Sequence, residues 1–381
     1  MKIITVIGAR PQIIKAAAIS REIFINYSNT ITEIIIHTGQ HYDQNMSEVF
    51  FEELNIPKPN YNLEVGSSSH GTQTARMIEG IEEILEKESP NYILLYGDTN
   101  STLAGAIAAS KTNIPIVHVE AGLRSFNRKM PEEINRVVCD HLSTFLFSPS
   151  GTGYENLIKE GFSKVHNKPY SPDNPGVFHC GDIMYDNSIH FAKLAKKKSI
   201  ILNDLELKPN EFVLTTIHRD HNTDFEENLI GIFKALIEIS KKYKVILPIH
   251  PRTKSKLEAL NNKTLFQTIN NQKNLKLIEP VSFLDMIQLE RNAKVVITDS
   301  GGVQKEAYFF NKPCIILRPE TEWVEILETK MAKLVSANFN KIIDTFNYFI
   351  SKKEKTFPLI FGDGNAAEFI CQKLFENNIK K

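Results

Sequence analysis

The chain lacks an excess of charge of either sign and contains few cysteines. Its 381 residues carry 45 Lys and Arg and 45 Asp and Glu, so the formal net charge is zero. That balance argues against a nucleic-acid partner or an anionic membrane surface. The four cysteines form no C-x-x-C pair and stand far apart, so the sequence suggests neither a zinc site nor a disulfide framework.

Long apolar runs are also absent. The chain begins with a short apolar stretch that ends at Gly8, which is shorter than the apolar core of a signal peptide. No stretch approaches the length of a membrane span. We therefore expect a soluble, cytoplasmic protein with reduced thiols. Its length exceeds what one ordinary core holds, so two domains are expected.

Short β-branched runs alternate with helical patterns along most of the chain. Strands are predicted at 3–7, 33–37, 92–96, 116–119, 145–147, 212–217, 245–249, 275–278, 295–298 and 314–317. Strands that alternate with helices indicate doubly wound parallel sheets. The sequence therefore predicts an α/β protein in which two Rossmann-like domains face each other across a cleft.

A stretch with three prolines among polar residues, 167–176, is the best candidate for an interdomain linker. It separates a predicted N-terminal domain, 1–170, from a predicted C-terminal domain, 171–364. A helical pattern follows in 365–381, and we expect that helix to pack back on the first domain.

One strand-to-helix junction is typical of a phosphate site. The strand that ends at Thr298 is followed by Ser300-Gly301-Gly302 and then by a helical pattern. Backbone N–H groups at such a helix start face the positive end of the helix dipole and bind phosphate. Glu306, about one turn into the helix, can accept hydrogen bonds from hydroxyls of a ligand. A tight turn without a ligand is the alternative interpretation.

Polar residues follow most of the predicted strands. In open α/β sheets the carboxyl ends of the strands form the crevice where ligands bind. These positions are Arg10, Asp98, Glu120, His218, Arg219, His250, Arg252, Ser300 and Arg318. The first half contributes mostly acids and the second half mostly bases. The set Arg10, His218, Arg318 and the Ser300 turn predicts a site for a doubly charged phosphate group.

Three carboxylates are candidates for proton transfer: Asp98, Glu120 and Glu132. Bunching them would raise at least one pKa into a useful range. Two of them have alternative roles. Asp98 could be a metal ligand or a helix cap, and Glu132 could stabilise a helix dipole. Lys15, one turn past the first strand, could be a solvated side chain. The histidines at 37, 41, 118 and 141 are expected to be structural.

Taken together, these segments resemble the non-hydrolysing UDP-N-acetylglucosamine 2-epimerases. The matching motifs are GARPQIIK (8–15), GDTNSTLAG (97–105), HVEAGLRS (118–125), MPEEINR (130–136), HR (218–219), HPR (250–252), TDSGGVQKEA (298–307) and TEWVE (321–325). The resemblance implies the two-domain fold shared with GT-B glycosyltransferases, a homodimer, a UDP-sugar substrate, and neither a nicotinamide cofactor nor a metal. It also implies inversion at C2 by anti elimination of UDP, through a 2-acetamidoglucal, and re-addition.

The resemblance implies roles by position. Asp98, Glu120 and Glu132 would be the acid/base group. His218, also counted as catalytic, would contact the pyrophosphate end together with Arg10 and the Ser300 turn. The implied substrate-binding residues are Arg10, Lys15, Arg219, Val281, Met286, Ser300, Gly301, Gly302, Glu306 and Arg318. Among these, Glu306 would bind the ribose and Arg318 the sugar side. Val281 and Met286 stand at the uracil side, where backbone and packing contacts are expected.

Several positions depart from the family pattern. His221 stands where a glutamate usually follows His-Arg, and Thr72-Gln73 replaces the Arg-Gln pair of members that their own substrate activates. Asp43 stands where those members place a second glutamine. We therefore predict little or no such activation; a sigmoidal rate curve abolished by trace UDP-GlcNAc would contradict this.

The substrate branch is open between UDP-GlcNAc and UDP-2,3-diacetamido-2,3-dideoxy-glucuronic acid. The motifs favour the second branch, which feeds O-antigen or capsule synthesis. Its C6 carboxylate needs a cation or backbone donors, and Lys15, Arg124 and Arg128 are the candidate cations. Two other functions remain as alternatives, a GT-B glycosyltransferase that uses a UDP-sugar and a nucleotide-sugar-binding regulator without turnover.

Overall fold

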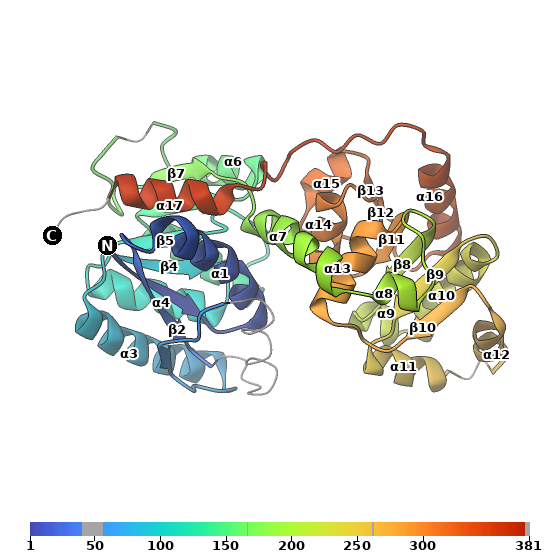
Figure 1. The fold of residues 1–381 in the computed structure, drawn as a ribbon. Coiled ribbons are helices and arrows are strands. Elements are labelled where there is room, and N and C mark those ends of the chain that lie inside the picture. Colours follow the sequence, from blue (N-terminus) through green and yellow to red (C-terminus); the bar gives the residue numbers. More distant parts are fainter. Residues whose placement is uncertain (40–55, 166, 261–262, 378–381) are drawn as a thin grey trace. The chain divides into compact units, whose positions relative to one another are not determined.

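The computed structural model describes residues 1–39, 56–165, 167–260 and 263–377. The chain divides into two compact units (Figure 1). The first unit contains Met1–Asn187 and Leu359–Lys381, and the second contains Ser188–Pro358. Each unit is built on its own parallel sheet with helices around it, so the predicted α/β class is confirmed.

The first unit holds a seven-stranded sheet with the order β3-β2-β1-β4-β5-β6-β7. Its strands are β1 (Lys2–Ile7), β2 (Thr32–His37), β3 (Tyr61–Asn62), β4 (Tyr92–Tyr96), β5 (Ile116–Val119), β6 (Phe145–Ser148) and β7 (Gly176–His179). The helical segments are α1 (Arg10–Glu22), a π-helical turn (Ile23–Tyr27), α3 (His70–Glu88), α4 (Asn100–Lys111), α5 (Pro131–Leu142), α6 (Gly151–Lys159) and α17 (Ala366–Glu376), with α7 (Ile183–Lys198) leading out. The central strands are buried on both faces, because their side chains are almost all apolar.

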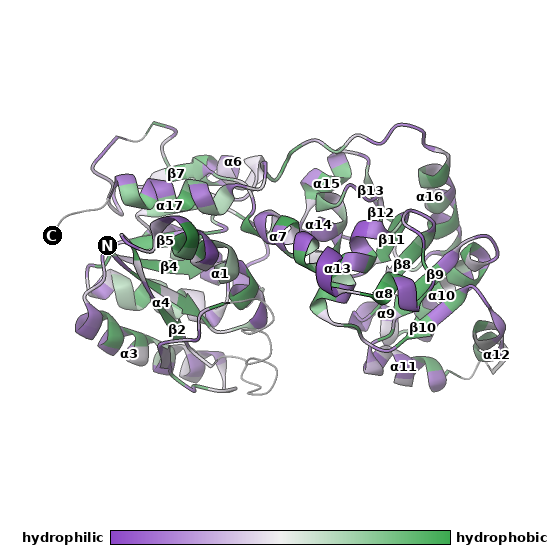
Figure 2. Ribbon diagram, viewed as in Figure 1, coloured by the Kyte–Doolittle hydropathy of each residue, from purple (hydrophilic) through white to green (hydrophobic). Residues whose placement is uncertain are grey.

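The second unit holds a six-stranded sheet with the order β10-β9-β8-β11-β12-β13. Its strands are β8 (Phe212–Thr216), β9 (Lys244–Pro248), β10 (Leu275–Ile278), β11 (Val295–Thr298), β12 (Cys314–Ile316) and β13 (Ala332–Leu334). Its helices are α8 (Ile201–Asp204), α9 (Asp220–Thr223), α10 (Glu226–Ser240), α11 (Pro251–Glu258), α12 (Lys263–Asn271), α13 (Phe283–Asn292), α14 (Gly301–Phe309), α15 (Val324–Glu328) and α16 (Phe339–Ser351). Figure 2 shows the apolar strands at the centre of each unit.

Both sheets reverse their strand order next to their first strand. In the first unit the reversal lies between β1 and β4, and in the second it lies between β8 and β11. The carboxyl ends of these pairs form the topological switch points, where open α/β sheets bind ligands. The predicted site residues of each unit follow these strands and their neighbours.

The structure moves the domain boundary from 170/171 to 187/188. The proline-containing stretch 167–176 is a loop inside the first unit, because β7 continues the first sheet beside β6 with Phe147 opposite Phe178. The chain leaves the first unit inside α7. The sequence pattern missed β7 because it has only four residues and starts with a glycine.

The chain returns to the first unit at Leu359, and α17 packs there on α1. Asp186 of α7 accepts a hydrogen bond from the Ala367 N–H at 2.8 Å, at the start of α17. Near the other end, the rings of Tyr27 and Phe375 lie 5.8 Å apart. The helix predicted in 365–381 is therefore α17, and residues 378–381 lie outside the described part of the chain.

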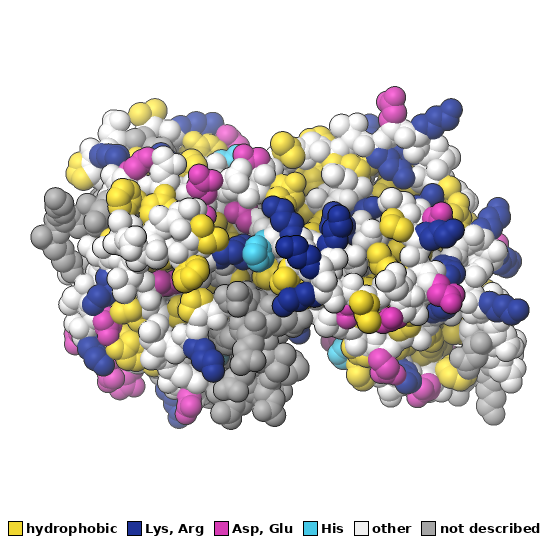
Figure 3. Space-filling view, in the orientation of Figure 1, with side chains coloured by type: hydrophobic (Ala, Val, Ile, Leu, Met, Phe, Trp, Pro, Cys, Tyr) yellow, Lys and Arg dark blue, Asp and Glu magenta, His cyan; other side chains and the backbone are white. Residues whose placement is uncertain are grey.

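The two units differ in charge although the whole chain is neutral. The first unit has 18 Lys and Arg against 25 Asp and Glu, and the second has 27 against 20. Figure 3 shows Lys and Arg side chains gathered over α7 and α13, where Lys193 and the run 196–198 are exposed. Across the described ranges, no helix is long and apolar enough to cross a membrane. All four cysteines are free thiols.

Candidate active site

At the switch point of the first unit, a buried glutamine joins the ends of β1 and β4. Gln12 accepts hydrogen bonds from the N–H groups of Gly8 (2.9 Å) and Ala9 (3.2 Å). Its Nε2 donates to the carbonyl oxygen of Tyr96 at 3.0 Å. Arg10 begins α1 between these anchored residues, and its side chain is exposed. Gln12 was not predicted as a site residue, because its burial is a property of the fold and the sequence shows only an amide shortly after a strand.

Lys15 and Glu120 form an ion pair, with 15% and 7% of their side chains exposed. Glu120 adopts a φ of +73°, which is uncommon for a residue with a side chain. Its N–H and that of Ala121 both donate to the Phe147 carbonyl at 3.0 Å. A Cβ at Gly97 would lie 3.1 Å from Lys15 Nζ and 3.2 Å from Glu120 Oε2. The bare glycine thus leaves room for a carboxylate that the backbone holds in a strained conformation.

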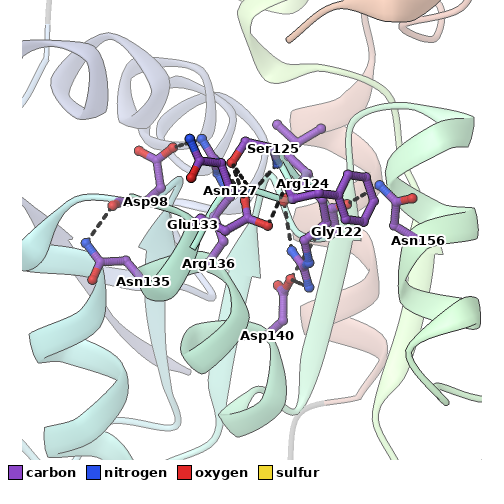
Figure 4. Close-up of polar contacts among 12 residues, drawn as sticks. Asp98, Gly122, Arg124, Ser125, Asn127, Glu133, Asn135, Arg136, Asp140 and Asn156 are labelled. Atoms are coloured by element: carbon purple, nitrogen blue, oxygen red, sulfur yellow. Dashed lines mark hydrogen bonds and ion pairs between the residues drawn. The ribbon is translucent and has the colours of Figure 1, made fainter. Parts of the chain in front are cut away.

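Asp98 follows β4 and forms an ion pair with Arg136 of α5, at 2.5 Å between Oδ2 and Nη2 (Figure 4). Arg136 is held from its other side by Glu133 at 3.2 Å. Burial would raise the pKa of Glu133, but hydrogen bonds from Ser125 and Phe126 together with the charge of Arg136 lower it. Glu133 is therefore an anionic anchor that orients Arg136, and Arg136 orients Asp98.

Glu132 differs from the other two predicted acid/base residues. It lies in the first turn of α5 with its side chain exposed. Within the described residues it has neither a hydrogen-bond partner nor an ion pair. Asp98 and Glu120 follow the paired strands β4 and β5 and are each held by a cation, whereas Glu132 is held by none.

A buried charged network lies beneath these loops. Asp140 contacts His118 Nδ1 at 2.6 Å and Arg124 Nη2 at 2.7 Å, and all three side chains are at most 1% exposed. Burial would raise the pKa of Asp140, but its two cationic partners lower it. Arg124 also donates to Glu160 at 2.7 Å. Its guanidinium is 1% exposed and paired with two carboxylates, which argues against the predicted contact with a sugar carboxylate, whereas Arg128 is exposed.

In the second unit, a buried carboxylate joins the ends of β8 and β11. Asp299 accepts hydrogen bonds from the N–H groups of His218 (3.1 Å) and Arg219 (3.0 Å). The imidazole Nδ1 of His218 lies 3.5 Å from Asp299 Oδ1, and the His218 side chain is 42% exposed. Burial lowers the pKa of His218, and the charge of Asp299 opposes that shift. Asp299 lies within the motif TDSGGVQKEA (298–307) but was not predicted as a site residue.

The predicted phosphate turn begins α14. A Cβ at Gly301 would lie 2.3 Å from Glu322 Oε1, so a larger residue there would displace the end of that side chain, whereas a Cβ at Gly302 would meet only Ser300 Oγ, at 3.9 Å. Ser300 donates its N–H to Thr298 Oγ1 at 2.9 Å. Arg318 follows β12 and contacts Glu322 Oε2 at 2.9 Å. Glu322 therefore brings Arg318 next to the turn, as a phosphate site requires.

Glu306 of α14 has a second carboxyl group as its neighbour, Glu290 of α13, which is only 1% exposed. Burial raises the pKa of both groups, and their mutual repulsion raises that of Glu290 further. The pair therefore holds a proton at a higher pH than a solvated carboxyl would. Val281 and Met286, half-buried, lie just before and within α13.

Three of the positions that depart from the family pattern, His221, Thr72 and Gln73, lie in the described part of the chain. His221 is exposed, with its ring 5.9 Å from that of Phe225. Gln73 is buried and accepts a hydrogen bond from Asn100 at 2.9 Å, while Thr72 is exposed in the first turn of α3. Asp43 and His41 lie outside the described residues.

Comparison with known proteins agrees with this geometry. A family profile described as UDP-N-acetylglucosamine 2-epimerase matches residues 25–375. A "UDP-N-acetylglucosamine 2-epimerase homolog" of Methanococcus maripaludis is 52% identical over 98% of this chain and 99% of its own length. The UDP-2,3-diacetamido-2,3-dideoxy-D-glucuronate 2-epimerase of Pseudomonas aeruginosa is 44% identical over the same shares. The UDP-GlcNAc 2-epimerase of Methanocaldococcus jannaschii, solved with UDP-GlcNAc and UDP, has a TM-score of 0.79 at 40% identity, covering 99% of this chain and 100% of its own. The fold expected from the motifs is confirmed, and the chain belongs to the UDP-N-acetylglucosamine 2-epimerase family.

Proposed function

We propose that this chain inverts C2 of a UDP-2-acetamido sugar without net hydrolysis. A base removes the C2 proton, and the C2–H electron pair forms the C1=C2 bond. The C1–O bond breaks, and its electron pair leaves with the β-phosphate of UDP, which gives a bound 2-acetamidoglucal. UDP then adds back at C1 while C2 takes a proton on the opposite face.

The observation that carries this proposal is the Lys15–Glu120 pair over Gly97. A partly buried carboxylate beside one cation can exchange a proton with a carbon acid when a ligand displaces water. Asp98, held by Arg136, is the second such group, on the neighbouring strand end. Two anchored carboxylates suit a reaction that must remove a proton from one face and return it on the other. Glu132 is the third candidate, with an exposed side chain.

The UDP end of the substrate suits the second unit, which carries more Lys and Arg than Asp and Glu. The N-terminus of α14 at Gly301 and the side chains of His218 and Arg318 offer donors for the pyrophosphate. These donors favour the leaving group because negative charge grows on the β-phosphate as the C1–O bond breaks. Glu306 provides a hydroxyl acceptor for the ribose, with Val281 and Met286 at the uracil.

We further propose a homodimer that works in the cytoplasm and supplies surface polysaccharide synthesis. The substrate branch favoured by the motifs is UDP-2,3-diacetamido-2,3-dideoxy-glucuronate. The motifs alone carry this choice, because the chain is 44% identical to the Pseudomonas aeruginosa enzyme and 43% identical to a UDP-N-acetylglucosamine 2-epimerase of Methanococcus maripaludis. With Arg124 buried in its own network, Arg128 and Lys15 remain as cations for the C6 carboxylate.

The test is proton NMR in D2O with purified protein and each UDP-sugar in a separate tube. Deuterium at C2 together with a gluco–manno mixture in one tube is the expected result, and that tube identifies the substrate. No exchange in either tube, with binding still detected, would overturn the proposal in favour of a glycosyltransferase. An assay for free UDP separates epimerisation from hydrolysis, which releases UDP and sugar.

A further inference from the structure

Asp299 accepts hydrogen bonds from two consecutive N–H groups of the loop after β8, although it lies at the end of β11. Its side chain is fully buried. Both oxygens lie 3.1 Å from the His218 N–H, and Oδ2 also accepts from the Arg219 N–H at 3.0 Å. Two consecutive N–H donors on one carboxylate restrict the backbone of both residues. The loop that carries His218 is therefore fixed to the end of the neighbouring strand.

Helix capping does not explain this carboxylate. Ser300, not Asp299, is the residue that precedes α14, and no side chain caps that helix by a hydrogen bond. A buried carboxylate needs several donors because an unpaired buried charge is costly. Asp299 finds them on the β8 loop and on the Nδ2 of Asn222, at 3.0 Å.

Asn222 extends the arrangement to a third strand end. Its Nδ2 also donates to the carbonyl oxygen of Leu317 at 2.9 Å, directly before Arg318. One carboxylate and one amide thus connect the strand ends from which His218, Ser300 and Arg318 emerge. A distortion at Asp299 would reach all three residues, and His218 contacts it twice, through its N–H at 3.1 Å and through its imidazole Nδ1 at 3.5 Å.

We propose that Asp299 is a positioning residue that holds His218 with Nδ1–H toward its carboxylate and Nε2 toward the ligand. The inference rests on the proposed function, in which that ligand is the pyrophosphate of UDP. The Nδ1 to Oδ1 separation of 3.5 Å is an ion-pair contact. It makes the Nδ1–H tautomer the favoured neutral form and stabilises the imidazolium, which can donate from Nε2 to the departing phosphate.

Among the charges around His218, the negative charge of Asp299 stabilises the imidazolium. Arg219 and His250 act on the imidazole in the opposite sense, and burial also disfavours its charged form. Asp299 is the acid that counteracts them. Removing its charge while keeping its shape would leave His218 neutral over a wider pH range, so it would donate less readily to a phosphate.

The first test uses the unchanged protein. Long-range proton–nitrogen correlation NMR, with the His218 signals assigned by their loss in His218→Gln, reports which ring nitrogen carries the proton. We expect Nδ1–H in the neutral ring at high pH. A neutral ring protonated at Nε2 would overturn the proposal, and this readout does not depend on turnover.

The second test compares Asp299→Asn with Thr253→Val. Thr253 is a buried neighbour of the same loop, whose hydroxyl donates to the Ile217 carbonyl at 2.6 Å, and its substitution changes no charge. We expect Asp299→Asn to lower the imidazole pKa of His218 by about one unit and kcat by about 10- to 100-fold, with a smaller change in KM. The pH profile of kcat should shift with the pKa.

Thr253→Val should lower the melting temperature while the His218 pKa and the pH profile stay as in the unchanged protein. If Asp299→Asn behaves like Thr253→Val, Asp299 only supports the loop and the proposal fails. The pKa shift is measured without substrate. A shift with no epimerisation by the unchanged protein would therefore contradict the proposed function and leave the positioning role standing.

Discussion

The two units share one strand order around their first strands but use the acidic residue at the switch point in opposite ways. In the first unit, Asp98 follows β4 with 30% of its side chain exposed and one arginine as its partner. In the second unit, Asp299 follows β11, the topological counterpart of β4, and is fully buried against backbone N–H groups. The first carboxylate remains accessible to a ligand, whereas the second accepts its hydrogen bonds from groups of the protein.

This difference shows that surroundings decide what a carboxylate at a strand end does. A half-buried acid beside a cation stays within reach of a ligand, whereas a buried acid that accepts from several donors fixes the geometry of the backbone around it. The same division runs through the units as wholes, because acids outnumber bases in the first and bases outnumber acids in the second. Proton chemistry suits the former and binding of a diphosphate suits the latter.

The largest effect that would test the comparison is expected at Glu120. Replacing Glu120 by Gln removes the carboxylate proposed to accept the proton and leaves Lys15 without the charge of its partner. We expect kcat to fall by about 10²- to 10⁴-fold, measured by C2 deuterium exchange. Glu155→Gln, at an exposed ion pair on α6, is the matched control and should change little. If the kcat of Glu120→Gln lies within threefold of that of the unchanged protein, Glu120 does not take part in the proton transfer.

The next largest effect is expected at Arg124, whose charge we expect to support the fold of the first unit and not the reaction. Arg124→Met would leave Asp140 buried without its arginine and free Glu160 as well. Breaking a buried pair from one side costs about 3–5 kcal/mol of unfolding free energy, which urea unfolding measures. Preference between the two UDP-sugars should not change, because Arg124 is 1% exposed.

Lys164→Met is the control for that experiment. Lys164 pairs with Glu155 while both side chains are at least half exposed, so its loss should change stability by about 0.5 kcal/mol or less. A changed sugar preference in Arg124→Met would show that the guanidinium reaches the substrate after all.

The smallest effect is a pH dependence confined to the first unit. Burial raises the pKa of Asp186 to about 6, whereas an unfolded Asp titrates near 4. The contribution of Asp186 to the free energy of unfolding is therefore fully present below about pH 4. It is lost as the pH rises through about 6, a change of about 2–3 kcal/mol. Asp186→Asn can still accept from Ala367 and should flatten this part of the curve. Urea unfolding between pH 4 and 7 tests it, with exposed Asp173→Asn as control; parallel curves for the two variants would contradict it.

Much of the fold was predictable because apolar strands alternate with helices. The ten predicted strand runs all correspond to strands of the two sheets. Three strands were missed, namely β3, β7 and β13, which have two to four residues and too little pattern to detect. The boundary was misplaced for the same reason, since β7 lies beyond the prolines.

The candidate site was predictable in its residue types but not in its partners. Strand-end position pointed to Glu120 and Asp98, and the structure adds their cations, Lys15 and Arg136. Sequence spacing cannot reveal that Arg124 is buried or that Asp299 faces His218, because those contacts join residues of different strands and helices. The roles of the individual carboxylates remain predictions.

The division of the chain also has a consequence for biosynthesis. The second unit is one uninterrupted segment, Ser188–Pro358, whereas the first unit includes Leu359–Lys381 with α17. At roughly 5–20 residues per second, the ribosome needs roughly 10–30 s to make the second unit. During that time α1 and its neighbours lack the helix that covers them, so the unit synthesised second is the first that can be completed.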